Sequence, residues 1–435
     1  MLLLHVSDVH FRYPICNTPM DPDRPYRTLL VQDARVRAKA LGGVDAILVG
    51  GDIAYAGSAL EYTAAFTWLA ELAAACGCRV ERIFVVPGNH DVDRSIITTR
   101  RSVQNAQQAI IRKDPQHRER ELLDQFLDGD AGRALFASIE AYNEFAARFS
   151  CQVFSPERLF WQQDLILDDS LTLRIYGLTS TLLSGARIPS GRDDTRGSLY
   201  LSPLQTVLDP VDGVVNLVLC HHPPDWFMDH DQVEDAIHGR AAIQLFGHRH
   251  LQRIQRDRGY IRFNAGAVNP DRTEVGWEPG YNLVRLTTAE VSGNRYVDVE
   301  AHLLLWQTGP DMFRPKLDLG HEEVFRHRLL VRAAARVAPD HADRPGAEIA
   351  PEASAPGNDE GTAMGDDERT RSLVFRFWNN LSSSQRREIA ERLGLIDAGE
   401  MSLSEPERYA RVLVRAGKRG LLDRLAAEIE ERENR

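Results

Sequence analysis

The sequence predicts an α/β domain followed by a small helical domain. Three observations support this prediction. Short apolar runs alternate with helical patterns early in the chain, later apolar runs follow one another with few helices between them, and an acidic segment precedes a final stretch with apolar stripes at helical spacing. With 435 residues, 43% of them hydrophobic and 26% charged, the chain can bury a full core and form two or three domains.

Short apolar runs in the first three quarters of the chain are expected to form strands. They are Leu2–Val6, Ala46–Val49, Ile83–Val86, Leu173–Tyr176, Val214–Leu219, Ile243–Phe246, Tyr260–Phe263, Tyr281–Leu286 and Val297–Leu305. Several are apolar at successive positions, which is typical of strands buried on both faces. Helical patterns at Tyr26–Leu41 and Leu60–Ala75 separate the first three, which predicts strand–helix–strand units. The later runs predict antiparallel pairing or a second sheet.

Residues 94–149 are expected to form a helical insertion or cap over one edge of the sheet. They are rich in charge and carry apolar residues at helical spacing, such as Leu122, Phe126 and then Phe136 and Ile139. We therefore assign residues 1–338 to a single domain that includes this insertion.

The segment 339–370 is expected to be a flexible acidic linker. Its residues 340–368 hold nine acidic residues against one arginine, and therefore −8 of the chain's net charge of −11. Without aromatic residues, this segment cannot bury enough apolar surface to offset its ordering entropy. No part of the chain is strongly basic, so the sequence lacks the basic surface typical of nucleic-acid-binding proteins.

Residues 371–435 are expected to form a small helical domain. Ser382 with Gln385, and Ser404 with Glu407, have the spacing of capping boxes that begin helices. Apolar stripes at helical spacing follow each of them.

We expect a cytoplasmic protein without a membrane span. No stretch approaches the ~20 consecutive apolar residues of a span, and the first residues lead directly to His5 and Asp8 without the apolar region of a signal peptide. The cysteines are odd in number and scattered, which favours reduced thiols over a disulfide framework; they are Cys16, Cys76, Cys78, Cys151 and Cys220.

Potential metal ligands occur in short motifs, most of which directly follow a predicted strand. The motifs are Asp8-Val9-His10, Gly51-Asp52, Gly88-Asn89-His90-Asp91, Cys220-His221-His222-Pro223 and Gly247-His248-Arg249-His250. Carboxylate and amide oxygens and imidazole nitrogens suit intermediate divalent metals, and side chains at strand ends meet at one edge of a sheet. Seven candidate ligands exceed the needs of one ion and suit two ions that share a bridging carboxylate.

In this order the motifs resemble those of the calcineurin-like metallophosphoesterase superfamily, over roughly residues 1–305. The family pattern is D-x-H, G-D, G-N-H-D or G-N-H-E, a strand-end histidine, and G-H-x-H. The resemblance implies a two-sheet sandwich flanked by helices and a site of two metal ions. Asp8, His10 and His250 would hold one ion, Asn89, His221 and His248 the other, and Asp52 would bridge them.

The resemblance also implies a mechanism. His90 would face the scissile phosphate and stabilise or protonate the leaving group, while the two ions share an attacking hydroxide. Such a ligand set accepts Mn, Fe, Zn, Co or Ni, and we expect Mn. For Arg12 and Arg249, contact with the substrate phosphate and simple solvent exposure are both open. His222 is expected to be a packed imidazole, with His221 as the ligand.

Two differences from the motifs of a related subfamily narrow the range of expected substrates. Protein serine/threonine phosphatases with this metal core carry an aspartate where this chain has Tyr55 and a glutamate where it has Asp91. These changes disfavour protein phosphatase activity and remove the carboxylate that would orient His90. The stretch Gly51–Tyr62 is more similar to bacterial phosphodiesterases of cyclic nucleotides and other small substrates. We therefore expect a nucleotide or nucleic-acid phosphodiesterase, with a DNA-repair-type nuclease or a non-catalytic metal-binding adaptor as alternatives.

The C-terminal residues 371–435 resemble the helical effector-associated adaptor domains of bacterial conflict systems. The resemblance rests on the patterns F-W-x-x-L, R-E-I-A-x-x-L-G-L and E-R-Y-A-x-x-L. It implies that this domain recruits a protein partner. The alternative is a helical tail that packs on its own catalytic domain, although the long linker favours a tether.

Overall fold

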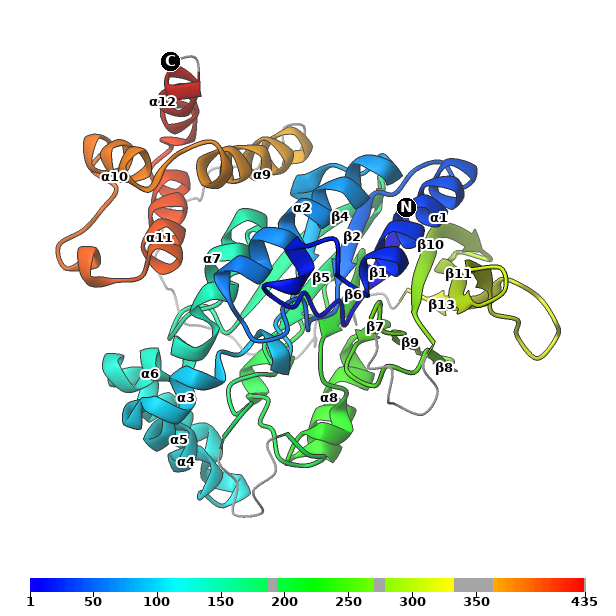
Figure 1. Cartoon of the computed structure of the whole chain (residues 1–435), viewed down its shortest axis with the longest axis horizontal. Coiled ribbons are helices and arrows are strands. Elements are labelled where there is room, and N and C mark those ends of the chain that lie inside the picture. The colour runs from blue at the N-terminus through cyan, green and yellow to red at the C-terminus, as the bar shows by residue number, and fades with distance from the viewer. Residues whose placement is uncertain (187–193, 270–277, 332–362, 434–435) are drawn as a thin grey trace, which may run out of the picture.

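The computed structural model describes residues 1–186, 194–269, 278–331 and 363–433, which form a two-sheet α/β domain flanked by helices and a C-terminal helical domain (Figure 1). Residues 339–362 of the expected linker lie outside the described residues. Among the residues that are described, no helix has both the length and the apolarity that a membrane span requires.

The first sheet mixes parallel and antiparallel strands in the order β12-β11-β10-β1-β2-β3, and β13 also pairs with β11. Its strands are β1 (Leu2–Val6), β2 (Ala46–Val49), β3 (Ile83–Val85), β10 (Gly280–Val291), β11 (Asn294–Gln307), β12 (Met312–Pro315) and β13 (Phe325–Leu330). The helices α1 (Arg24–Ala40) and α2 (Ala59–Cys76) connect β1 to β2 and β2 to β3, which therefore run parallel. The expected strand–helix–strand units are thus present.

The second sheet has the order β4-β5-β6-β7-β9-β8. Its strands are β4 (Phe160–Asp168), β5 (Leu171–Leu178), β6 (Val214–Cys220), β7 (Ile243–Phe246), β8 (Arg253–Asp257) and β9 (Tyr260–Asn264), with α8 (His230–Arg240) between β6 and β7. The central strands β5, β6, β7 and β9 are parallel, while β4 and β8 pair antiparallel at the two edges. Both arrangements expected for the later strands occur: β6, β7 and β9 lie in a second sheet, while β10 and β11 pair antiparallel in the first. β8 was not expected because its residues are charged and largely exposed.

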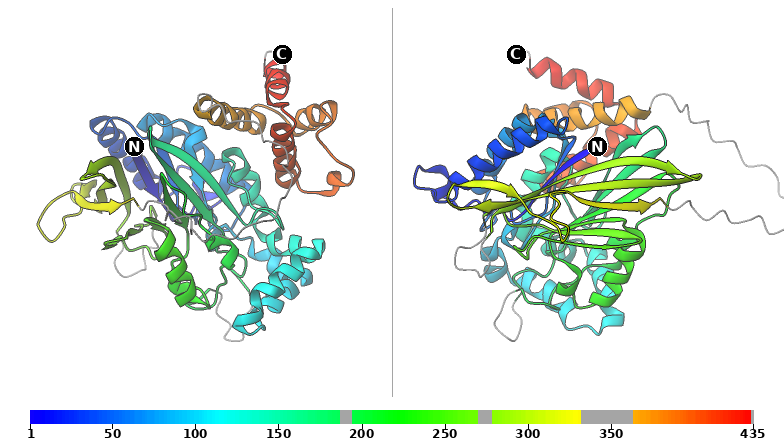
Figure 2. Two further views of the ribbon diagram at one scale, coloured as in Figure 1. Left: turned by 180° about the vertical axis from the view of Figure 1, so that it is seen from behind. Right: turned by 90° about the vertical axis from the view of Figure 1, so that its right-hand side faces the viewer.

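One continuous core joins the two sheets. Buried apolar side chains of β1, β2 and β10 belong to the same cluster as those of β6 and β7, for example Leu4, Leu48, Leu217, Leu245 and Leu283. The sheets form two layers, with α1 and α2 on one side of the molecule and α8 on the other (Figures 1 and 2). This sandwich places the carboxyl ends of its parallel strands at a common edge.

The region 94–149 is helical along most of its length. Its helices are α3 (Arg94–Thr99), α4 (Arg101–Ile111), α5 (Pro115–Leu127), α6 (Gly129–Phe136) and α7 (Glu140–Ala146), with short 3-10 turns η4 (Ala137–Ile139) and η5 (Ala147–Phe149). The Tyr142 hydroxyl on α7 donates to the carbonyl of Val85 at the end of β3, over 3.0 Å. This bond joins the insertion to the strand that leads into the Gly88–Asp91 motif.

The C-terminal domain consists of α9 (Ala363–Asn379), α10 (Ser383–Arg392), α11 (Glu405–Lys418) and α12 (Leu422–Glu433). Its core includes Phe377, Ile389 and Tyr409. Helix α9 begins inside the stretch 339–370 that was expected to be linker. Glu368 on its second turn pairs with Arg79 of the α/β domain.

The two expected capping boxes differ in outcome. Ser382 and Gln385 form one at the start of α10. Ser404 occupies the N-cap of α11, but its side chain makes no capping hydrogen bond. The expected second box is therefore wrong. Glu407, the other member of that box, instead pairs with Arg411 one turn later on α11.

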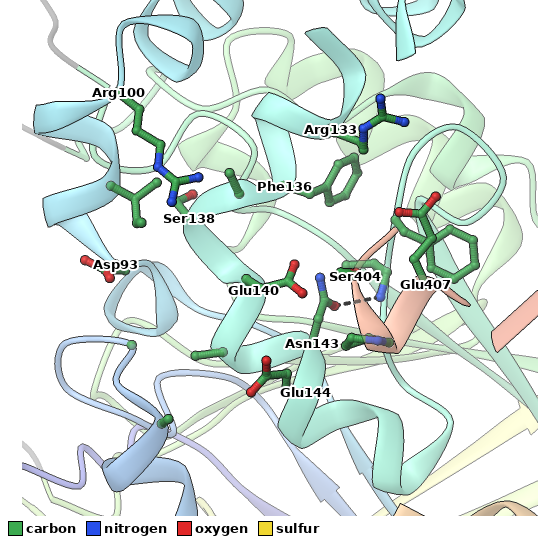
Figure 3. Close-up of a pocket in the computed structure, with 18 residues that line it drawn as sticks. Asp93, Arg100, Arg133, Phe136, Ser138, Glu140, Asn143, Glu144, Ser404 and Glu407 are labelled. Carbon is green, nitrogen blue, oxygen red and sulfur yellow. Dashed lines mark hydrogen bonds between the residues drawn. The ribbon is translucent and has the colours of Figure 1, made fainter. Parts of the chain in front are cut away.

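The C-terminal domain packs against its own catalytic domain through α9 and α11. Ala147 of η5 is fully buried in the same apolar cluster as Phe377. Arg148 donates to Asn379 over 3.0 Å, and Arg411 pairs with Glu157 at 2.8 Å. A cavity of about 500 Å³ lies between the two domains, with side chains of the insertion on one side and those of α11 on the other (Figure 3). The packed tail, the less favoured alternative from the sequence, is the arrangement that the structure adopts.

Ala147→Glu is expected to release the C-terminal domain. A buried, unpaired carboxylate at this contact costs about 3 kcal/mol or more, which exceeds what exposed ion pairs such as Arg411–Glu157 contribute. Small-angle scattering should show an increased radius of gyration. Ala74→Glu on the exposed side of α2 serves as the control and should leave the scattering unchanged. Unchanged scattering in Ala147→Glu would contradict the packing described above.

Candidate metal centre

The five motifs meet at the carboxyl edge of the parallel strands. Asp8 and His10 follow β1, Asp52 follows β2, and Asn89 and His90 lie in the 3-10 turn η3 (Asn89–Asp91) after β3. From the second sheet, His221 follows β6, while His248 and His250 follow β7. Strands of both sheets thus deliver side chains to one place, which no single sheet could do alone.

The first group of side chains surrounds Asp8 and Asp52. His250 Nε2 lies 3.1 Å from Asp8 Oδ1, and His10 Nε2 lies 3.2 Å from Asp52 Oδ2. The potential ligand atoms of Asp8, His10 and His250 all lie within 4.8 Å of one another. This spacing lets the three side chains hold one ion.

The second group lies on the other side of Asp52. His221 Nε2 is 3.3 Å from Asp52 Oδ2 and 3.2 Å from Asn89 Oδ1, and His248 Nδ1 is 3.3 Å from the same His221 nitrogen. Asp52 Oδ2 therefore faces a histidine from each group, which is the position required of a bridging carboxylate. The assignment of these seven residues as ligands remains a prediction, but the structure brings all seven together.

The backbone around the site is held in an uncommon conformation. Among the described residues, non-glycine residues with positive φ are Asp8, His10, Asp52, Ser150, His248, His250, Ser292 and His321. Five of these eight are expected ligands. Left-handed backbone at a non-glycine residue is unfavourable and persists where the surrounding structure imposes it, commonly at functional sites.

Two glycines let the motif loops approach each other closely. A Cβ at Gly88 would lie 2.2 Å from Asp52 Oδ1, and a Cβ at Gly51 would lie 2.7 Å from His221 Nδ1. Gly51 also has φ of +93°. Any larger residue at these positions would push the ligand side chains apart, so the glycines of the G-D and G-N-H-D motifs are steric requirements.

The electrostatics of the centre suit cations. Burial would raise the pKa of Asp52, but the histidines His221 and His10 hold it well below its usual value, so the carboxylate is ionised. Burial lowers the pKa of His248 to about 3, with a further contribution from His221. His248 is therefore a neutral imidazole whose ring nitrogen faces another ring nitrogen at 3.3 Å. Against the lowering effect of burial, Asp52 in turn raises the pKa of His221 to about 9 and raises that of His10, so these two imidazoles carry the compensating positive charge that a divalent ion would replace. Crowded carboxylate, amide and imidazole donors of this kind match divalent metal ions.

Contacts behind the ligands fix their orientation. His221 Nδ1 donates to the carbonyl of Gly50 over 2.7 Å, which directs Nε2 toward the centre. The backbone of Asn269 contacts two of the ligand residues. Its carbonyl oxygen lies 3.3 Å from His10 Nδ1, and the Asn269 N–H donates to the carbonyl of Asp8. Asn269 follows β9 and was not identified from the sequence, because a lone asparagine outside the motifs carries no recognisable signal.

Asp91 has a role that the sequence did not indicate. Its carboxylate is fully buried and accepts hydrogen bonds from the backbone N–H groups of Ile53, Ala54 and Gly88 and from the Tyr62 hydroxyl, at 2.8 to 3.2 Å. Burial and the nearby Asp52 raise the pKa of Asp91 to about 6. This side chain fastens the loop after β2 to the loop after β3, and so sets the distance between Asp52 and Asn89.

The remaining candidates occupy distinct positions. His222 is buried, with Nδ1 2.8 Å from Ser180 Oγ and Nε2 3.2 Å from Asn89 Oδ1, so it packs beside the ligands as expected but also lies within ligand distance of the second group. Arg249 pairs with Asp225 at 2.6 Å through one terminal nitrogen of its guanidinium. The Arg12 guanidinium lies over the ring of Tyr55, at 4.0 Å from the ring centre.

Comparison with known proteins agrees with this picture. Residues 1–252 match the model of a family described as calcineurin-like phosphoesterase, and residues 369–431 match the model of the GTPase-associated adaptor domain. Both resemblances noted in the sequence, to a metallophosphoesterase and to a helical adaptor domain, are thereby confirmed. No curated protein matches the sequence significantly.

Several solved structures are similar in fold. Vps29 from Chaetomium thermophilum has 10% identity and a TM-score of 0.29, covering 76% of this chain and 100% of that one. A predicted phosphoesterase from Streptococcus pneumoniae has 12% identity and a TM-score of 0.28, covering 75% and 97%. GAP50 from Plasmodium, described as an anchor in the inner membrane complex, has 10% identity and a TM-score of 0.38, covering 77% and 90%.

Proposed function

The chain belongs to the calcineurin-like phosphoesterase family, and from this premise we propose that it is a two-metal phosphodiesterase acting on a nucleotide or nucleic-acid phosphodiester. One observation carries the proposal above all others. Asp52 Oδ2 lies within 3.3 Å of a histidine from each of two ligand groups, so a single carboxylate faces both metal positions.

The residues divide the chemical work between them. Divalent ions, when bound, supply positive charge to the phosphate oxygens and bring the pKa of water close to neutrality. Asp8, His10 and His250 would hold one ion, Asn89, His221 and His248 would hold the other, and Asp52 would serve both. The loops held by Asp91 keep this set at a fixed spacing. His90 lies beside the set and stabilises or protonates the leaving oxygen.

A phosphodiester is favoured over a phosphoprotein by the residues around His90. Where protein serine/threonine phosphatases carry an aspartate and a glutamate, this chain has Tyr55 and Asp91. The carboxylate is therefore absent at the first position and one carbon shorter at the second. Asp91 faces the backbone N–H groups of the neighbouring loops, not the His90 ring. A panel of cyclic nucleotides, dinucleotides and single- and double-stranded DNA, assayed with Mn²⁺, identifies the substrate within this class.

Metal removal is expected to abolish turnover reversibly. The purified protein should contain about two equivalents of divalent metal, and it should hydrolyse bis-para-nitrophenyl phosphate. A chelator should remove both the metal and the activity, and Mn²⁺ should restore them, because the clustered carboxylates and imidazoles at the strand ends offer ligand atoms to the metal within 4.8 Å of one another. Elemental analysis and a chromogenic assay measure the two quantities. Full activity in protein freed of metal would contradict the proposal.

The C-terminal adaptor domain recruits a partner protein to the phosphodiesterase. Its match to the GTPase-associated adaptor domain supports recruitment of another protein. Since α9 and α11 contact the catalytic domain, the surface of α10 and α12, which lies on the far side in Figure 1, is where that partner binds. Pull-down by the intact chain, compared with a chain carrying charge reversals at Arg387 and Glu391 on α10, tests this assignment.

A further inference from the structure

The ring of Tyr55 lies between Arg12 and His90. The Arg12 guanidinium carbon is 4.0 Å from the centre of the Tyr55 ring. The rings of Tyr55 and His90 are stacked, with their centres 5.0 Å apart and their planes inclined by 26°. A cation, an aromatic ring and an imidazole thus form a continuous stack that ends at the side chain expected to act on the leaving group.

The backbone of Tyr55 also contacts the same histidine. His90 Nδ1 lies 2.9 Å from the carbonyl oxygen of Tyr55. Because a carbonyl only accepts hydrogen bonds, Nδ1 must carry the proton in this bond. The other nitrogen, Nε2, is then the atom left for chemistry at the phosphate. One residue therefore determines both the tautomer of His90, through its carbonyl, and the plane of the ring, through its side chain.

Both layers of the stack are fixed by main-chain bonds. Phe11 pairs with Ala54 as an isolated parallel bridge, and the Tyr55 N–H donates to the Phe11 carbonyl over 3.1 Å. On the other side, the His90 N–H donates to Asp52 Oδ1 over 2.8 Å. The loops that carry Arg12, Tyr55 and His90 are thereby tied to one another and to the bridging carboxylate. A side chain held on such supports keeps one orientation.

The His90 ring also borders open space. A cavity of about 310 Å³ is lined by Tyr55, His90 and Arg94, among others. On its opposite side the His90 ring meets the edge of His10, with ring centres 4.8 Å apart. The imidazole thus stands between the metal ligand His10 and a cavity that can admit the leaving group.

We propose that Tyr55, backed by Arg12, is a positioning residue that holds the His90 imidazole toward the leaving oxygen of the phosphodiester. This inference rests on the proposed phosphodiesterase function. As the bond between phosphorus and the leaving oxygen breaks, its electron pair stays on that oxygen. The doubly protonated His90 ring transfers its Nε2 proton to the oxygen and keeps the Nδ1 proton bonded to the Tyr55 carbonyl, so the ring ends as the neutral tautomer that this carbonyl selects. The tyrosine takes the place of the carboxylate that serves this purpose in the protein phosphatases, and it acts by stacking and by its carbonyl in place of a negative charge.

The test uses the intact chain loaded with Mn²⁺ and a series of methyl aryl phosphates with increasing leaving-group pKa. Tyr55→Ala should retain kcat within about twofold on the best leaving group and lose about tenfold on the poorest, since a good leaving group needs little help from an acid. KM should change by less than about twofold. Tyr55→Phe keeps the stacked ring and the carbonyl, so it should match the wild type across the series. Arg12→Met, which removes the cation, should fall between them.

Several results would overturn the proposal. An equal loss in Tyr55→Ala on every leaving group, or a Tyr55→Phe variant as defective as Tyr55→Ala, would remove the positioning role while leaving the phosphodiesterase activity intact. Absence of metal-dependent turnover in the wild type would overturn the proposed function and this inference together. Tyr55 is 40% exposed, so its variants are expected to fold, and unchanged metal content and Tm confirm that for each.

Discussion

Asp52→Asn is expected to abolish phosphodiester hydrolysis while the protein remains folded. Asparagine keeps the shape of the side chain but removes the negative charge that faces both ligand groups at 3.2 and 3.3 Å. Loss of a mere supporting partner of a metal ligand costs about 10- to 100-fold in affinity or activity, and loss of the shared ligand itself should cost more. We expect kcat/KM on bis-para-nitrophenyl phosphate to fall by more than about 100-fold, with less than two equivalents of metal bound.

The control for this variant is Asp231→Asn on α8, where the carboxylate is exposed. It should have wild-type activity and metal content. Circular dichroism and a cooperative unfolding transition should be the same for both variants. Normal turnover in folded Asp52→Asn would disprove the bridging role and, with it, the two-metal mechanism.

Asp91→Ala is expected to produce the largest loss of stability. The carboxylate accepts hydrogen bonds from the N–H groups of Ile53, Ala54 and Gly88, all of them in buried residues. Each buried donor left without an acceptor costs about 1 to 3 kcal/mol, so the free energy of unfolding should fall by roughly 3 to 5 kcal/mol after partial relaxation. Activity should fall as well, because the loops that carry Asp52 and Asn89 lose their common anchor.

Urea denaturation of the metal-free protein measures the loss without a contribution from bound ions. Asp93→Ala provides the comparison, since that carboxylate accepts only at the N-terminus of α3, where a lost cap costs about 1 kcal/mol. If Asp91→Ala costs no more than Asp93→Ala, the carboxylate does not hold the two loops together.

Much of the fold could be predicted because the central strands are buried and mostly apolar. The strands β1, β2, β6, β7 and β9 lie where apolar runs predict them. The edge strands were harder to predict from the sequence, because one or both of their faces are exposed to solvent. β8 consists of Arg-Ile-Gln-Arg-Asp, and β13 consists of Phe-Arg-His-Arg-Leu-Leu with only one buried residue, so neither has the continuous apolar run that predicts a strand.

The candidate site could likewise be predicted only in part from the sequence. The ligand motifs were visible because each combines a glycine or a charged residue with a histidine directly after an apolar run. Asp91 was visible too, yet its significance was misjudged: it was taken only as a departure near His90, whereas it accepts hydrogen bonds from backbone groups 37 and 38 residues away. Backbone donors have no sequence signature, so no pattern could reveal that contact.

The sequence by itself determined the α/β class, the adaptor-like helical domain and the set of residues available as metal ligands, because apolar periodicity and ligand chemistry are properties of short segments. Only the tertiary structure decided how His90 is oriented, how the loops after β2 and β3 are joined, and that the C-terminal domain packs on its own catalytic domain. Those features depend on pairs such as Tyr55 with His90 and Glu157 with Arg411. Such pairs are distant in the chain, and they meet only when the two layers and the insertion have folded around them.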